Sequence, residues 1–73
     1  MTAIIESATI NGIVLRKGTS VEIDIWQDGK TMEVTVLGIT LENNEITIES
    51  VTNYGSIIHH TAEQWEDMLV QKI

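Results

Sequence analysis

The sequence has no cysteine, no proline and no phenylalanine, and only four basic residues. Without cysteine no disulfide can stabilise the fold, which is consistent with a reducing compartment. Without proline every backbone N–H remains available for strand pairing. Direct binding to nucleic acid or to an anionic membrane needs clustered Lys or Arg, and Arg16 and Lys17 form the only adjacent basic pair. We therefore expect neither kind of binding.

Long apolar runs are also missing. Residues 1–6 have no basic region followed by an apolar stretch, so they do not form a signal peptide. No run approaches the roughly 18–20 apolar residues that cross a bilayer. The sequence therefore predicts a cytoplasmic protein, and its start at Met1 predicts a complete chain.

The remaining composition predicts one small globular domain over residues 1–73. Hydrophobic residues make up 42% of the chain, and eleven acidic residues against four basic ones give a formal net charge of −7. This charge is compatible with a basic protein surface, a cation or a second copy as partner, and also with solubility alone.

The most informative pattern surrounds Asp28-Gly29. If these two residues form a tight turn, the apolar residues of the flanking strands pair on one side, with Ile25 opposite Met32, Ile23 opposite Val34, and Val21 opposite Val36. The same register places Asp24 opposite Glu33 and Trp26 opposite Thr31 on the other side. The sequence therefore predicts an antiparallel ribbon with an acidic outer face that carries Trp26.

Two further turns and one bulge complete the predicted sheet. Asn11-Gly12 and Asn43-Asn44 favour two-residue turns, because asparagine and glycine tolerate positive φ. The strand from Thr31 to about Leu41 changes its apolar phase at Gly38, which predicts a β-bulge and a bend. Strands are also expected over 45–51 and 56–60.

The pattern becomes helical after Thr61. Thr61 and Gln64 match a capping box. An apolar stripe at helical spacing follows: Ala62, Trp65, Met68 and Leu69. The sequence predicts a helix from Ala62 to near Leu69, and residues 70–73 either finish this helix or form a last short strand.

About five strands, a long strand bent at Gly38 and a short helix before the final segment resemble the small SH3-like barrels. The resemblance covers most of the chain and implies a mainly β fold, an antiparallel barrel of about five strands with one short C-terminal helix. Trp26, Tyr54 and Trp65 are the only aromatic residues, so the aromatic peptide-binding groove of many such barrels is missing. A fold resemblance by itself assigns no function.

The candidate binding residues are Glu22, Asp24, Trp26 and Glu33. Carboxylates that face each other across strands repel, so an acidic row suggests a surface for Lys or Arg of a partner. An exposed tryptophan beside it is a typical interface anchor. The alternatives are solvated positions that discourage edge-to-edge aggregation, and a Trp26 that covers an open end of the core or packs under the helix.

The other chemistry-bearing residues predict neither an enzyme nor a cofactor. His59 and His60 are adjacent in a strand and point to opposite faces, so they do not share one metal ion. The serines lack a surrounding nucleophile motif, and the glycines are too scattered for a phosphate loop.

Two functions follow from these observations. The first is a non-enzymatic protein-binding module with a basic partner, acting as an inhibitor or regulator, whose charge imitates nucleic-acid phosphate. In length and acidity the chain looks like small phage-encoded inhibitors. The second is a structural protein that self-associates through sheet edges into a dimer or ring.

Overall fold

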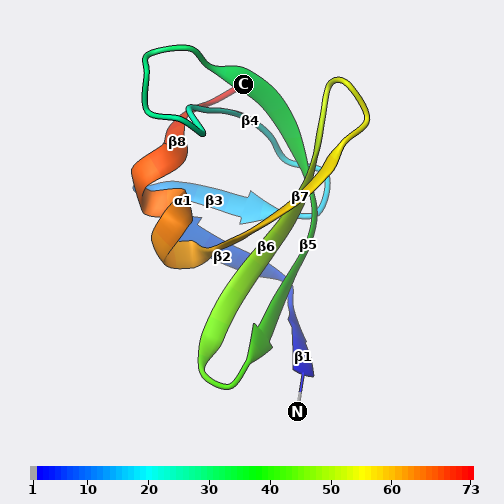
Figure 1. Ribbon diagram of the computed structural model, residues 1–73. Coiled ribbons are helices and arrows are strands. Elements are labelled where there is room, and N and C mark those ends of the chain that lie inside the picture. The colour runs from blue at the N-terminus through cyan, green and yellow to red at the C-terminus, as the bar shows by residue number, and fades with distance from the viewer. Residues whose placement is uncertain (1) are drawn as a thin grey trace.

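The computed structural model describes residues 2–73 and contains a six-stranded antiparallel sheet, a separate hairpin and one short helix (Figure 1). In chain order the elements are β1 (Thr2–Ile5), β2 (Ser7–Ile10), β3 (Ile13–Arg16), β4 (Ser20–Ile23), β5 (Met32–Glu42), β6 (Glu45–Thr52), β7 (Ile57–Thr61), α1 (Ala62–Met68) and β8 (Leu69–Lys72). The predicted mainly β, antiparallel fold with one short C-terminal helix is confirmed.

The long strand β5 is the centre of the sheet. One of its edges pairs with β6, and the other is shared by β4 near its start and β1 near its end. The strand order is β7-β6-β5-β4-β8, and within residues 2–73 β7 and β8 do not pair with each other. The sheet is therefore open, and closure into a barrel stays a prediction. The pairing of β1 with β5 was not foreseen.

Both asparagine turns form as predicted. Asn11 and Gly12 have φ of 51° and 79°, and Ile10 pairs with Ile13. Asn43 and Asn44 have φ of 52° and 65°, and the pairing that follows places Leu41 opposite Ile46 and Glu42 opposite Glu45. These local turns fix the registers of the β2–β3 and β5–β6 hairpins.

The prediction of a tight turn at Asp28-Gly29 is wrong. Strand β4 ends at Ile23, which pairs with Met32, and Val21 pairs with Val34. The connection is an eight-residue loop, 24–31, in place of a two-residue turn. The register differs from the prediction by two residues, so the residues that lie in β4 and β5 stay on their predicted faces while their cross-strand partners change. Residues 24–26, which were predicted to continue the strand, lie in the loop instead.

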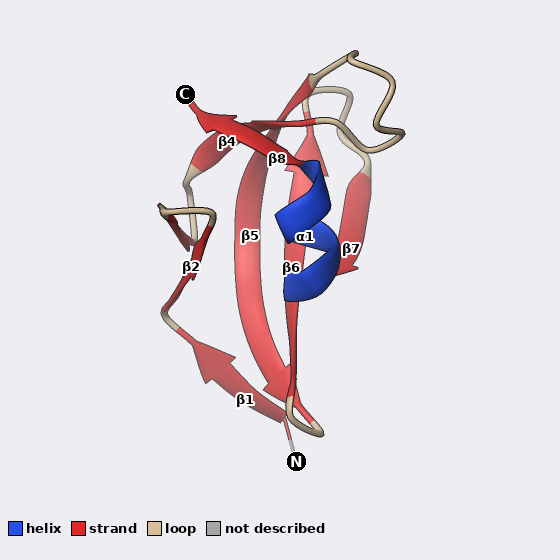
Figure 2. Ribbon diagram, turned by 90° about the vertical axis from the view of Figure 1, so that its left-hand side faces the viewer, coloured by secondary structure: helices blue, strands red, loops and turns tan. Residues whose placement is uncertain are grey.

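A bulge bends β5 where predicted. The β5–β6 register shifts between Val36 and Gly38, which leaves Leu37 as the extra residue. Figure 2 shows β5 as a long curved strand with β1 and β4 on the same edge.

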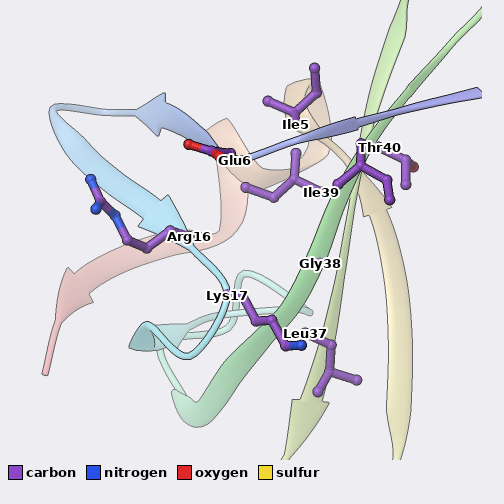
Figure 3. A pocket seen from close by; sticks show the side chains of 9 residues that line it. Ile5, Glu6, Arg16, Lys17, Leu37, Gly38, Ile39 and Thr40 are labelled. Carbon is purple, nitrogen blue, oxygen red and sulfur yellow. The ribbon is translucent and has the colours of Figure 1, made fainter.

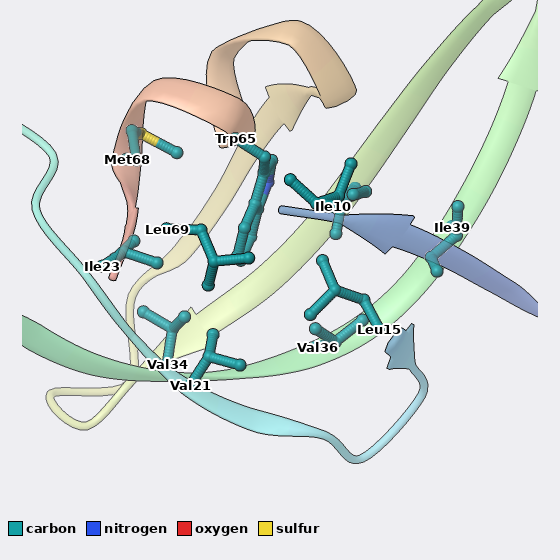
Figure 4. Close-up of a cluster of buried hydrophobic side chains, with 11 residues drawn as sticks. Ile10, Leu15, Val21, Ile23, Val34, Val36, Ile39, Trp65, Met68 and Leu69 are labelled. Atoms are coloured by element: carbon teal, nitrogen blue, oxygen red, sulfur yellow. The ribbon is translucent and has the colours of Figure 1, made fainter. Parts of the chain in front are cut away.

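The core lies between the sheet and α1. Thr61 and Gln64 form the capping box, the helix ends at Met68, and the tail continues as β8, which decides between the two predicted alternatives. Figure 4 shows Trp65 among the aliphatic side chains of the sheet and of the β2–β3 hairpin. The buried core comprises Ile10, Leu15, Val21, Ile23, Val34, Val36, Ile39, Ile48, Trp65, Met68 and Leu69.

Candidate binding surface

Glu22 and Glu33 form the acidic pair on the outer face of the β4–β5 ribbon. They are direct cross-strand partners, so the predicted pairing of Asp24 with Glu33 is wrong. Like charges in this position destabilise a sheet by up to about 1 kcal/mol. The Glu22 carboxylate is half-buried and accepts hydrogen bonds from the Thr31 hydroxyl at 3.0 Å and from the Gln71 amide. Glu33 is exposed, and its carboxylate makes no hydrogen bond or ion pair with residues 2–73.

Asp24 organises the loop 24–31 instead of facing outward as a contact residue. Its carboxylate oxygens accept hydrogen bonds from the backbone N–H groups of Asp28, at 3.1 Å, and Gly29, at 2.9 Å. Its own N–H donates to the Met68 carbonyl at 2.8 Å. The last bond draws residue 24 toward the end of α1, which explains why β4 stops at Ile23.

Trp26 projects from this loop and is 71% exposed. The alternative that it covers the core is therefore wrong, and Trp65 occupies the core instead. The hydrogen bonds of Asp24 hold both ends of the segment that carries Trp26. A large aromatic side chain on a fixed loop loses little conformational freedom on binding, which suits an interface anchor.

A second acidic pair lies at the far end of β5. Glu42 and Glu45 are cross-strand partners beside the Asn43-Asn44 turn. The Thr2 hydroxyl donates a hydrogen bond to the Glu42 carboxylate and ties β1 to this end. Opposed carboxylates therefore occur at both ends of the longest strand.

The two histidines lie on opposite faces of β7, as predicted. His59 is exposed and its Nδ1 lies 3.2 Å from an oxygen of Glu49. His60 is half-buried, and burial, followed by the charge of His59, lowers its pKa below 6.5. Within residues 2–73 no three His, Asp or Glu side chains are grouped closely enough to hold a metal ion.

A groove that sequence reasoning missed lies between the end of β1, the end of β3 and the bulge of β5 (Figure 3). This β1–β5 groove has a volume of about 570 Å³. Its lining includes Ile4, Ile5, Leu37, Ile39, Arg16 and Lys17. The available signals were the apolar Ile4-Ile5 pair, the one adjacent basic pair and the Gly38 phase change, but only the fold brings them together.

Comparison of the chain with family models, characterised proteins and solved structures found no match. In the part of the chain that the structure describes, no helix is both long enough and apolar enough to cross a membrane.

Proposed function

We propose that this protein is a small, non-enzymatic module that binds a protein with a basic surface. Trp26 is the apolar anchor, and Glu22 and Glu33 supply negative charge beside it. The observation that carries the proposal is the 71% exposure of Trp26 on a loop whose backbone is held by Asp24. Asp24 is a positioning residue in this scheme.

The net charge of −7 supports electrostatic steering of a basic partner. If the partner normally binds nucleic acid in a basic cleft, this protein would compete with the nucleic acid for that cleft. The proposed role is therefore that of an inhibitor or regulator. The proposal includes an SH3-like barrel as the scaffold, supported by the bend of β5 at its bulge, and the cytoplasm as the compartment, supported by the absence of cysteine.

Capture from native lysate with matched variants tests the proposal. The immobilised baits are the unchanged protein, Trp26→Ala, Glu33→Lys and, as a control, Tyr54→Ala, because Tyr54 is 84% exposed on a different loop. We expect at least one protein whose affinity falls by about 30-fold or more with Trp26→Ala, the loss of a typical hot spot. Glu33→Lys should weaken the same complex, and Tyr54→Ala should leave it unchanged.

The result that would contradict the proposal is unchanged binding. If every captured protein binds Trp26→Ala and Glu33→Lys as well as it binds the unchanged chain, this surface is not the site. Asp24→Lys is unsuitable as a probe, because it would disturb the loop itself.

Self-association is the second candidate, and exposed apolar sheet edges favour it. Strand β1 carries no charged residue and its Ile4 is 86% exposed, while Ile57 on the terminal strand β7 is 58% exposed. An uncharged, unpaired edge is a template for another strand. Light scattering across a dilution series separates the candidates: a dimer that Ile4→Lys or Ile57→Lys abolishes supports self-association, and a monomer at all concentrations excludes it.

A further inference from the structure

We propose that the β1–β5 groove binds a small aliphatic carboxylate, such as a medium-chain alkanoate. This inference goes beyond protein binding and concerns a surface that does not include Trp26, Glu22 or Glu33. Figure 3 shows the Lys17 side chain extending toward Leu37, with Ile5 and Ile39 close together nearby.

The groove arises from a gap in the pairing of β5. Strand β1 covers β5 from Ile39 onward, and the backbone of Gly18 and Thr19 bonds to Val36 at 2.8 and 2.9 Å. Between them, no strand of the described chain pairs with Leu37 or Gly38 on this edge. A Cβ placed on Gly38 would meet nothing within 4 Å, so the floor at the bulge is open.

The surface of the groove is largely aliphatic. Ile4 is 86% exposed, Ile5 and Leu37 are half-buried, and the core residue Ile39, which is 2% exposed, borders the groove from below. An alkyl chain lying here would remove apolar area of both partners from water. The volume of about 570 Å³ lies within the range of roughly 300–1,000 Å³ that is typical of small-ligand sites.

The charge beside the groove has the opposite sign to that of the whole molecule. Arg16 and Lys17 are two of only four basic residues, and Glu6 is the one acidic residue in the lining, which leaves a local balance of +1 against −7 overall. Neither Arg16 nor Lys17 makes an ion pair with residues 2–73. Apart from Lys30 and Lys72, the charged residues outside the groove are acidic and repel anions, which favours a carboxylate in the groove.

The shape favours a small ligand over a protein segment. The groove is lined only by residues 4–6, 16–17 and 37–40, and the chain bends at Glu6 and turns at Lys17-Gly18, so each segment contributes only a short stretch to the lining. A flexible alkyl chain with one anionic end matches both the aliphatic floor and the basic rim.

Titration of the full chain with octanoate and decanoate, below their micelle concentrations and followed by amide NMR shifts, tests the proposal. We expect saturable shifts at Ile4, Leu37 and Gly38, and affinity that rises by up to about fourfold for each added methylene. Decylammonium has the same number of carbon atoms and the opposite charge, so it should bind more weakly than decanoate.

Matched variants locate the site. Lys17→Gln should weaken decanoate binding by about two- to fivefold, the usual range for an exposed charge pair. Ile4→Ser should weaken it as well without unfolding the protein, because Ile4 is already 86% exposed. Lys30→Gln, which removes a charge outside the groove, should have no effect.

Several results would overturn the proposal. These are shifts that do not saturate, shifts centred on Trp26 or Tyr54, equal binding of decylammonium, or equal effects of Lys17→Gln and Lys30→Gln. Because Trp26→Ala leaves the groove intact, decanoate binding by that variant separates this inference from the proposed protein-binding function.

Discussion

At the scale of single residues, the two tryptophans have opposite roles. Trp65 is fully buried and Trp26 is 71% exposed. Truncating a buried tryptophan leaves a large cavity, so we expect Trp65→Ala to lower the free energy of unfolding by about 3–5 kcal/mol. Trp26→Ala should change it by no more than about 0.5 kcal/mol.

Urea unfolding followed by circular dichroism measures this contrast without relying on tryptophan fluorescence. If Trp65→Ala does not fold, Trp65→Phe provides a milder comparison, because it keeps most of the apolar contact and removes an indole N–H that has no hydrogen-bond partner. Equal stabilities of the Trp65→Ala and Trp26→Ala proteins would contradict the assigned core.

Asp24 stabilises the loop 24–31 through two accepted backbone hydrogen bonds. Asp24→Ala leaves both N–H groups without this acceptor, and we expect a loss of about 1–2 kcal/mol in the free energy of unfolding. The stability of Asp24→Asn should lie between those of the unchanged protein and Asp24→Ala, because the asparagine side chain retains one acceptor oxygen. Hydrogen exchange of the Asp28 and Gly29 amides should accelerate in Asp24→Ala and remain unchanged in Glu33→Gln, a control without a bonded carboxylate. Unchanged exchange in Asp24→Ala would refute the role given to this carboxylate.

At the scale of elements, the start of α1 depends on its capping box. Thr61 Oγ1 accepts from the Gln64 N–H at 3.2 Å, and the Gln64 side chain accepts from the Thr61 N–H at 2.9 Å. Thr61→Ala should cost about 0.5–2 kcal/mol of unfolding free energy, whereas Thr61→Ser, which keeps the acceptor, should cost less. Urea unfolding of the two variants measures both losses of unfolding free energy. Equal losses would show that the cap does not contribute to stability.

The elements also show which features a sequence can predict. The turns at Asn11-Gly12 and Asn43-Asn44 and the cap at Thr61 depend on residues a few positions apart, and all three were predicted correctly. The register of β4 with β5 was predicted wrongly, because Asp24 bonds to Met68, which is forty-four positions away in the sequence. A local turn signal at Asp28-Gly29 could not reveal that competing contact.

At the scale of the whole molecule, the two surfaces differ in how far the sequence predicts them. The acidic pair follows from a local pattern, and the β1–β5 groove does not. The outward positions of Glu22 and Glu33 follow from strand alternation, which a two-residue change of register preserves. The β1–β5 groove needs three segments, around residues 5, 17 and 38, to meet at one gap in the sheet. No periodicity within any one segment predicts that meeting, so a site of this kind appears only in the folded structure.

Global stability should depend on pH through His60. Burial, and secondarily the charge of His59, lower its folded pKa below the value of 6.5 expected when unfolded. The unfolded chain therefore binds a proton more readily, so the stability that neutral His60 provides is fully present above pH 6.5 and is lost as the pH falls from 6.5 to the folded pKa.

Urea unfolding at a series of pH values from 8 to 5 measures this slope of unfolding free energy against pH. His60→Gln should flatten it, whereas His59→Gln should keep most of it because burial is the larger cause. If His60→Gln retains the full slope, the pH dependence originates in another group, and the packing of β7 against α1 does not disfavour the imidazolium.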